Sequence, residues 1–244
     1  MNSRTVTALV GAAALLVLVL PQTAMAQSLN LELGDGPTST GRLIQLFLLF
    51  TLLSLAPSFL VMVTCFTRIV VVLSFLRTAM GTQSTPPNQV LMSLAMFLTL
   101  FIMMPTLEEA WDNGVQPYIA GQINEQVAFE RTAAPVRVFM LKHVRDTDLQ
   151  LFADAARVDT TVTEVPLRAL IPAFMISELR RSFEIGFLVF IPFLVIDMVV
   201  ASVLMSMGMM MLPPVMIAMP FKIIFFVLVD GWFLIVGSLI QSFG

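Results

Sequence analysis

The chain has 244 residues, of which 58% are hydrophobic and 12% are charged, and its formal net charge is −3. Soluble domains carry roughly a quarter charged residues, so this composition indicates a membrane protein. The lack of a basic excess argues against nucleic-acid binding. A single cysteine excludes an internal disulfide, and a single histidine leaves too few ligands for a zinc site. We therefore expect no metal and no other cofactor, and a packing or surface role for Cys65 and His143.

The first 26 residues have the pattern of a cleaved signal peptide. An apolar run over residues 6–20 follows a basic start and ends at Pro21, and the small-x-small sequence read by signal peptidase ends at Ala26. The alternative is an uncleaved anchor helix, which the shortness of the apolar run disfavours. Cleavage would leave residues 27–42, which contain several glycines, as a flexible lead-in on the periplasmic side.

Residues 43–104 predict a first helical hairpin. As a helix, the 34 residues Leu43–Leu76 would measure about 51 Å, well beyond the roughly 30 Å of hydrocarbon in a bilayer. Pro57 predicts a kink in this arm. Residues 81–89 read as a turn, because glycine and two prolines cannot continue a helix. The second arm, Val90–Met104, has 15 residues and is short for a membrane span.

Residues 105–185 form a water-compatible block, because 20 of the 29 charged side chains lie between Glu108 and Glu184. We expect short helices that form a small periplasmic insertion. One is predicted to begin at Thr106, whose spacing to Glu109 is that of a capping box. Two others are predicted to have a proline in the first turn, at Pro135 and Pro166. The block is either a small cap with its own core or a partner-binding face, and the sequence leaves both open.

Residues 186–244 predict a second helical hairpin. Gly186–Met211 and Val215–Phe243 are each long enough to span a bilayer, and a Leu-Pro-Pro sequence joins them. From a translocated N-terminus, both hairpin turns would face the cytoplasm, and the middle block and the C-terminus would face the periplasm. Arg68, Arg77 and Lys222 lie near the two turns, as the positive-inside tendency favours.

Three ionisable residues interrupt the second hairpin. Asp197 lies 16 residues before Pro213, and Asp230 lies 16 residues after Pro214, so the two acids should lie at one height. Lys222 should lie about 12 Å closer to the turn. We therefore predict that Lys222 does not pair within its own hairpin but with an acid of a neighbouring copy. The alternative is an ordinary structural contact between helices, with no transport role.

The run SELRRSFE (177–184) places two opposite-charge pairs at helical spacing, Glu178 with Arg181 and Arg180 with Glu184. Exposed pairs of this kind contribute a few tenths of a kcal/mol. Surface stabilisation is the simpler interpretation, and an interface role the alternative. Together with the three ionisable residues of the second hairpin, this run supplies the candidate charge contacts between subunits: Glu178, Arg180, Arg181, Asp197, Lys222 and Asp230.

Seven methionines lie within residues 205–219, where the second hairpin turns. Thioether side chains are unbranched and deformable, so they can close a gap and repack around varied surfaces. The cluster is either ordinary core or lipid-facing filling, or a flexible apolar seal. The candidate residues are Met205, Met207, Met209, Met210 and Met211, with Gly208, Pro213 and Pro214 shaping the turn.

Four runs together carry a family resemblance: RIVVVLSFLRTAMGTQSTPPNQVL (68–91), IPAFMISELRRSFEIGF (171–187), IPFLVIDMVVASVLMSMGMMMLPP (191–214) and FKIIFFVLVDGW (221–232). The chain resembles the FliP/SctR family of type III export-gate subunits. The resemblance covers most of residues 43–244, and the signal peptide is similar to that of the flagellar branch.

The resemblance implies a pentamer-like ring assembled with FliR- and FliQ-type subunits in the inner membrane, at the flagellar basal body. Such a ring is the entry portal for unfolded flagellar subunits, and energy comes from separate export-platform proteins and an ATPase. The family's methionine gasket maps onto Met209, Met210 and Met211. The resemblance also implies that the assembled hairpins tilt and are raised above the bilayer plane.

We therefore expect a gated protein-export conduit without enzymatic activity, since the chain has no P-loop, HExxH sequence or nucleophile elbow. One alternative is a proton-coupled small-solute carrier that uses Asp197, Asp230 and Lys222 as a relay. The other is a scaffold that nucleates the export apparatus and does not conduct.

Overall fold

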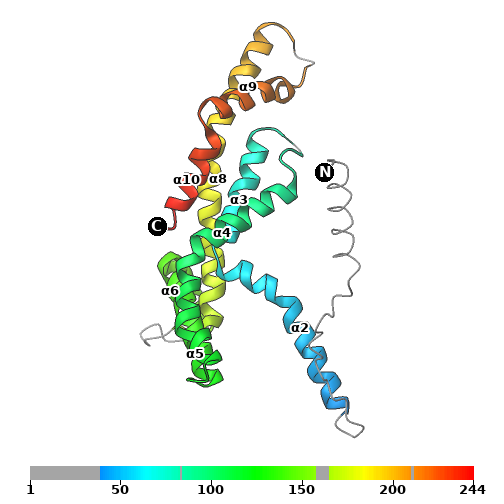
Figure 1. Cartoon of the computed structure of the whole chain (residues 1–244). Helices are drawn as coiled ribbons and strands as arrows, with labels where there is room; N and C mark the ends of the chain where they lie inside the picture. The colour runs from blue at the N-terminus through cyan, green and yellow to red at the C-terminus, as the bar shows by residue number, and fades with distance from the viewer. Residues whose placement is uncertain (1–38, 83, 158–164, 210–211) are drawn as a thin grey trace, which may run out of the picture. The chain divides into compact units, whose positions relative to one another are not determined.

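The computed structural model describes residues 39–82, 84–157, 165–209 and 212–244, and these residues form helices and loops without any strand. The helices are α2 (Ser39–Val63), α3 (Phe66–Ala79), α4 (Asn88–Ala110), the π-helix η1 (Trp111–Val115), α5 (Gln116–Ile119), α6 (Glu125–His143), α7 (Asp146–Ala155), α8 (Leu167–Ser206), α9 (Pro214–Leu228) and α10 (Gly231–Gln241) (Figure 1). The all-helical prediction is confirmed. The predicted signal peptide, residues 27–38 of the lead-in, Met210 and Met211 lie outside the described residues.

The chain divides into two compact units, residues 1–52 and 53–244. In the first unit, the described residues form the start of α2, which presents exposed apolar side chains such as Phe47 (71% exposed) and Phe50 (66% exposed). An apolar helix surface of this kind needs lipid or another protein around it. The second unit carries the packed core and every candidate site residue that the structure describes.

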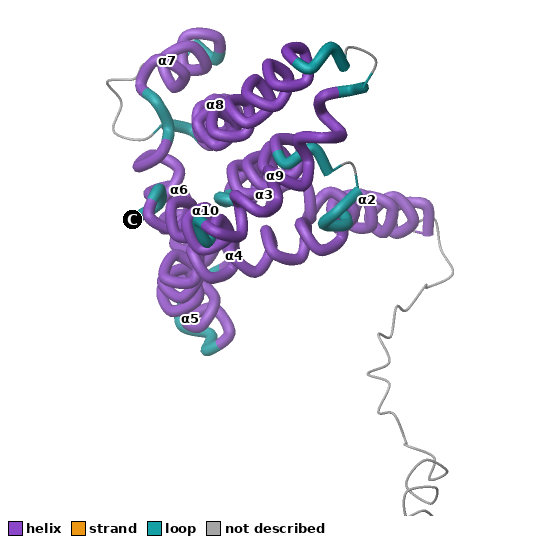
Figure 2. Tube along the Cα trace, turned by 90° about the horizontal axis from the view of Figure 1, so that it is seen from above, coloured by secondary structure: helices purple, strands orange, loops and turns teal. Residues whose placement is uncertain are grey.

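Helices α3 and α8 form the centre of the second unit and run side by side in the same direction. Arg68 at the start of α3 contacts Glu178 of α8, and Phe75 further along α3 packs edge-to-face on Phe183, with ring centroids 5.1 Å apart. Gly186 lies against the same Phe75 ring, so the two backbones approach closely there. Figure 2 shows α4, α6 and α10 together on the side of this pair where α3 lies.

Three buried apolar clusters surround the pair. The largest joins α3, α4 and α10, and its buried members are Cys65, Phe66, Ile69, Val72, Leu73, Leu91, Ala95, Leu98, Met103, Leu239 and Phe243. A second lies between α3, α8 and α9, with Leu76, Phe193 and Phe226 at its centre. A third joins α6 and α8 through Met140, Leu170 and Phe174. The buried members of this third cluster all belong to the middle block, because the start of α8 lies within residues 105–185.

The first hairpin differs from its prediction in both arms. The first arm is not one continuous helix, because α2 ends at Val63 and α3 begins at Phe66. Pro57, where the sequence predicts a kink, lies within α2. The second arm is not short, because α4 continues through η1 and α5 to Ile119, making 32 residues. Thr106 therefore begins no new helix. Pro105 lies inside α4. A proline removes one backbone hydrogen bond, but a helix that packs along its length can continue past it.

The middle block is helical as predicted, but its helices begin elsewhere. Pro135 lies inside α6, which begins after Asn124, whose side chain accepts a hydrogen bond from the backbone N–H of Val127 at 2.9 Å. Asn124 is thus an ordinary N-cap residue, and an asparagine at this position of the sequence could have predicted the start of α6. Pro166 directly precedes α8, as expected of a proline at a helix start. The 40-residue α8 runs without a break from the middle block into the second hairpin.

The second hairpin also departs from two straight spans. Helix α8 ends at Ser206 rather than Met211, and α9 and α10 meet at a bend of 64°. At the bend Asp230 has φ 51°, in the left-handed region, and Gly231 lies so close to the Phe226 ring that a Cβ there would overlap it. The Asp-Gly dipeptide was the missed turn signal.

Within the described ranges, two helices, Asn88–Ile119 and Leu167–Ser206, are long and apolar enough to cross a membrane. The number rises to four if the two bent pairs, Leu43–Leu55 with Pro57–Val63 and Pro214–Leu228 with Gly231–Gln241, each form one span. The fold is that of an all-helical membrane protein.

Candidate functional site

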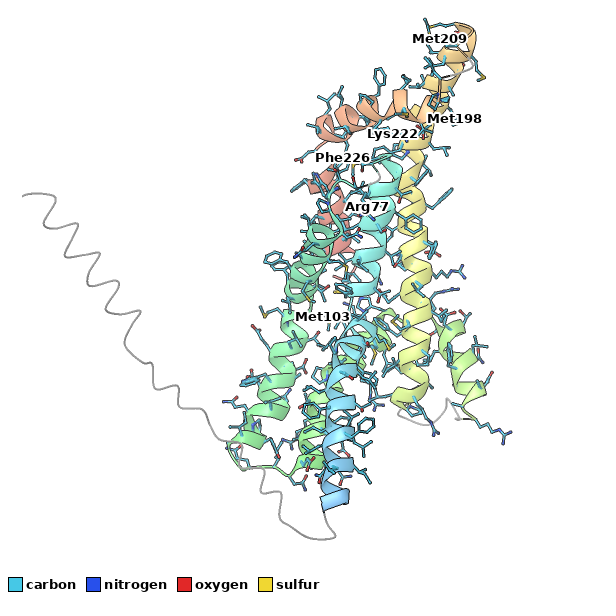
Figure 3. The ribbon with its side chains drawn as sticks, turned by 90° about the vertical axis from the view of Figure 1, so that its right-hand side faces the viewer. Arg77, Met103, Met198, Met209, Lys222 and Phe226 are labelled. Carbon is cyan, nitrogen blue, oxygen red and sulfur yellow. The ribbon has the colours of Figure 1, made fainter. Side chains whose placement is uncertain are left out.

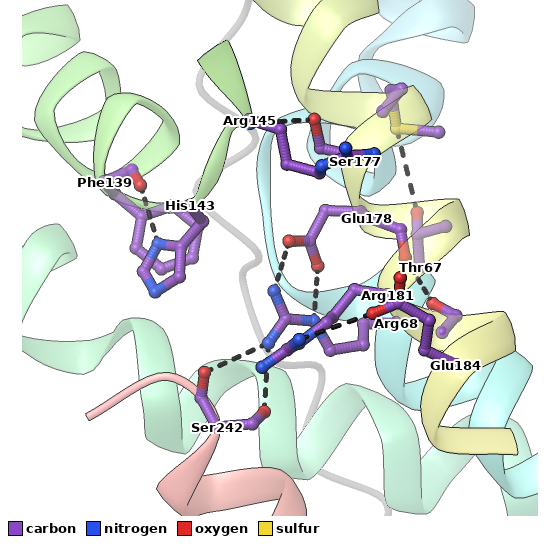
Figure 4. Close-up of polar contacts among 12 residues, drawn as sticks. Thr67, Arg68, Phe139, His143, Arg145, Ser177, Glu178, Arg181, Glu184 and Ser242 are labelled. Atoms are coloured by element: carbon purple, nitrogen blue, oxygen red, sulfur yellow. Dashed lines mark hydrogen bonds and ion pairs between the residues drawn. The ribbon is translucent and has the colours of Figure 1, made fainter. Parts of the chain in front are cut away.

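A fully buried ion pair joins α3 to α8. The guanidinium of Arg68 donates through Nε to Oε2 of Glu178 at 2.9 Å and through Nη2 to Oε1 (Figure 4). Its remaining nitrogen, Nη1, donates to the backbone oxygen and the hydroxyl of Ser242 at 3.1 and 3.0 Å. The Phe243 ring covers the guanidinium at 3.7 Å from its centroid. Arg68 is 3% exposed and Glu178 is 0% exposed, so the charges are paired in the fork geometry that favours burial.

This junction contradicts the predicted surface pair of Glu178 with Arg181. The prediction assumed that the charged face of the helix is solvated, but Glu178 lies on the face of α8 that packs against α3. The pair of Arg180 with Glu184 is confirmed, with Nε 3.1 Å from Oε1, and Arg181 contributes a second, longer contact of 3.4 Å. All three side chains are exposed, so this triad remains available for contacts with other molecules.

His143 lies beside the junction and has a packing role. Its ring is 5.2 Å from that of Phe243, and its Nδ1 is 2.8 Å from the backbone oxygen of Phe139. Burial lowers the pKa of His143, and the nearby charge of Arg68 lowers it further. The imidazole is therefore neutral near pH 7. Among the described residues, no three histidine, cysteine, aspartate or glutamate side chains are grouped so as to hold a metal ion.

A second buried ion pair corrects the prediction for Lys222. Its ammonium lies 2.6 Å from Oδ2 of Asp197, within the same hairpin, and donates a second hydrogen bond to the backbone oxygen of Ala79 at 3.0 Å. The Lys222 side chain is 3% exposed and that of Asp197 is 29% exposed. The prediction that Lys222 finds no acid in its own hairpin is wrong.

The error came from the assumed centre of the turn. The prediction places the centre of the turn between Pro213 and Pro214. In the structure, α8 already ends at Ser206 and α9 begins at Pro214. The centre of the connection therefore lies earlier. Asp197 is nine residues before the end of α8 and Lys222 eight residues after the start of α9, which brings them to nearly the same height.

Two features of the acids remain after this pairing. The other carboxylate oxygen of Asp197, Oδ1, is buried and has no hydrogen-bond partner in the described part of the chain. Asp230 is exposed at the α9–α10 bend and makes no ion pair with any described residue. The two acids therefore have different surroundings, and they do not form a common relay with Lys222.

The methionine turn, which we define as residues 205–214, lies at the end of this hairpin. Its described methionines are exposed: Met205 by 60%, Met207 by 62% and Met209 by 42%. Gly208 has φ +75°, the left-handed conformation that favours glycine, and it ends α8 as a C-cap glycine does. Pro213 precedes α9 and Pro214 is its first residue. Figure 3 shows Met209 at the tip of the hairpin, with Lys222 nearer its base.

These features define a class of protein: an all-helical membrane protein whose longest helix is tied to its neighbours by buried ion pairs and ends in an exposed methionine turn. A profile of the FliP family matches residues 49–239, and the chain belongs to that family.

Individual relatives extend this match over nearly the whole chain. It is 57% identical to the flagellar biosynthetic protein FliP of Caulobacter vibrioides, over 95% of this chain and 88% of that protein. The protein of the same description from Bacillus subtilis is 53% identical, over 90% of this chain and its own full length. That of Aquifex aeolicus is 48% identical, over 88% and 91%.

Proposed function

We propose that this chain is a core subunit of the flagellar type III protein-export gate. In this proposal several copies, in a pentamer-like arrangement with FliR- and FliQ-type subunits, surround a conduit for unfolded flagellar subunits. The chain makes and breaks no covalent bond, and other components of the export apparatus supply the energy. Membership of the FliP family and the printed description of its relatives as flagellar biosynthetic proteins support the flagellar role.

The exposed methionine turn is the observation that carries the proposal. Its side chains are apolar and flexible, and the described ones are not covered by other parts of the chain. In a single copy such a surface has no apolar partner except lipid, whereas in a ring the same surfaces can meet and close an opening. Thioethers suit this task because they repack around a passing chain of variable shape and close again behind it.

The proposal places the protein in the bacterial inner membrane at the flagellar basal body. The mature N-terminus, the middle block and the C-terminus face the periplasm, and the two hairpin turns face the cytoplasm. The exposed charges of Arg180, Arg181 and Asp230 are available for contacts between subunits. Exposed apolar positions such as Phe47 and Phe187 contact lipid or the neighbouring gate subunits.

The test is substitution of Met209 by alanine in the intact export complex, reconstituted in vesicles loaded with a small fluorescent anion. We expect faster dye efflux from M209A than from the parent complex, while the mass of the complex is unchanged. Met198→Ala is the matched control, because Met198 is 56% exposed on α8 but lies outside the turn. An unchanged efflux rate would favour a scaffold. Stoichiometric binding of a small solute by the purified chain would favour a carrier.

A further inference from the structure

Lys222 joins three helices at the base of the methionine turn. It belongs to α9, its ammonium contacts Asp197 of α8 at 2.6 Å, and it donates to the backbone oxygen of Ala79, the last residue of α3, at 3.0 Å. The last carbonyls of a helix lack partners within the helix and carry the negative end of its dipole. The ammonium therefore satisfies a carbonyl of α3 and a carboxylate of α8 with one charged group.

The surroundings hold this contact in place. Gly81 turns the chain directly after α3 with φ +76°, and a Cβ at that position would come within 4.0 Å of the Lys222 ammonium. Arg77 then bonds to Asn88 across the same turn and closes the first hairpin at this end. The apolar cluster of α3, α8 and α9, which includes Phe193 and Phe226, excludes water from the other side. Lys222 is accordingly one of the most buried charged residues of the described chain.

Beyond this contact, the two arms of the second hairpin carry few other restraints. On the stretch from Met198 to Phe221, Leu204 and Ala218 are the only described residues that are buried. Val203 of α8 and Ile217 of α9 both line an open apolar groove between the arms. Over the described residues, no other ion pair or hydrogen bond joins α8 to α9 between Lys222 and the turn. Asp197 lies nine residues, or about 13 Å, below the end of α8.

We propose that Lys222 is a positioning residue for the methionine turn. Through Asp197 it sets the separation and register of the two arms, and through Ala79 it ties them to the turn of the first hairpin. This inference rests on the proposed gate function, because only that function gives the Lys222 contact a purpose, which is to hold the methionine turn in place. Without the contact the arms remain helical, but the methionine side chains lose their fixed position.

The experiment measures the distance between spin labels at V203C and V215C, on opposite arms and each more than half exposed. The fully buried Cys65 stays in place, and labelled chains are diluted so that each export complex carries one labelled copy. We expect one narrow distance for the parent chain and loss of that narrow distance in K222M and in D197A. Methionine keeps the length and unbranched shape of the lysine stem, so an effect of K222M reports the polar contacts rather than packing.

Two variants separate positioning from general destabilisation. D197N retains an oxygen that can accept from Lys222, so it should keep the parent distance. R145M removes a partly exposed ion pair of α7 and should also leave the distance unchanged. If K222M fails to fold, D197A still tests the inference, because it leaves the bond between Lys222 and Ala79 intact. Parent-like distances in K222M and D197A, or in D197A alone where K222M does not fold, would overturn it.

The efflux assay distinguishes this inference from the gate proposal. K222M should leak at a rate comparable to that of M209A if both statements hold. If M209A does not leak but K222M loses the narrow distance, the gate proposal fails and the geometric inference stands. If M209A leaks and K222M keeps the narrow distance, the gate proposal stands and the positioning role is refuted.

Discussion

The two buried ion pairs of α8 differ in how completely their atoms are satisfied. At Glu178 both carboxylate oxygens accept from Arg68, and the remaining guanidinium nitrogen is bonded to Ser242. At Asp197 one oxygen is paired with Lys222 and the other has no partner in the described residues. A buried polar network rigidifies a junction when every member is bonded, and an unpaired buried polar group costs free energy. The junction of α3, α8 and the segment after α10 is thus fully bonded, whereas the contact below the methionine turn leaves one carboxylate oxygen without a partner among the described residues.

Of the three substitutions considered, Glu178→Gln should lower the free energy of unfolding most. The amide nitrogen would face the N–H groups of Arg68 and leave a buried guanidinium without its counter-charge. Removal of one partner from a buried pair typically costs 3–5 kcal/mol in the free energy of unfolding. Denaturant unfolding of the detergent-solubilised protein measures the change. Glu184→Gln removes an exposed carboxylate from the same helix and serves as the control that should unfold like the parent chain.

Gly186→Ala tests the close approach of α3 and α8 between the two ion pairs. A Cβ at this position would lie 2.6 Å from the Phe75 ring and 3.2 Å from the Phe75 Cβ, so α3 itself must move. Overpacking of this kind costs typically about 1–3 kcal/mol. Gly237→Ala, at an open position of α10, should instead stabilise the protein by about 1 kcal/mol. Equal thermal midpoints for the two variants would show that the helices are not in close contact.

Asp197→Asn should have the smallest effect of the three. The side-chain oxygen can still accept from Lys222, and the amide nitrogen takes the place of an oxygen that has no partner. The buried Lys222 ammonium loses its counter-charge, but we expect a smaller loss in the free energy of unfolding than for Glu178→Gln, because Asp197 is 29% exposed and its remaining oxygen still accepts from Lys222. Comparison with Glu178→Gln under identical conditions is the decisive measurement. If the asparagine variant is destabilised as much as the glutamine variant, the two ion pairs stabilise the fold equally.

Errors in the prediction of secondary structure lay at helix ends. Apolar runs and turn composition correctly indicated helices over most of the described chain, and the family resemblance drawn from four runs is confirmed by the profile match. Two predicted helix starts were wrong, because α4 continues through Pro105 and Thr106 and because Pro135 lies inside α6. Packing of long apolar helices offsets the one hydrogen bond that a proline removes, and a local pattern carries no information about that packing.

The partners of charged residues were harder to predict than the ends of helices, and Glu178 shows why. It lies in a charged run and its spacing to Arg181 fits a surface pair, yet the side chain is fully buried against an arginine 110 positions earlier. Lys222 was misplaced because the end of α8, five residues earlier than expected, shifts the height of every residue on the returning arm. The composition did indicate a turn next to Pro213, although α8 ends earlier than expected, and the role of the methionines there stays a prediction.

By itself, the sequence determined the helical membrane character of the chain, its family and the position of the methionine turn, because hydrophobicity, composition and local motifs act within a few residues. Only the tertiary structure decided which charges meet. Whether a lysine or glutamate is paired depends on where distant helices end and how closely they approach, and a shift of a few residues along a helix moves a side chain by several ångströms.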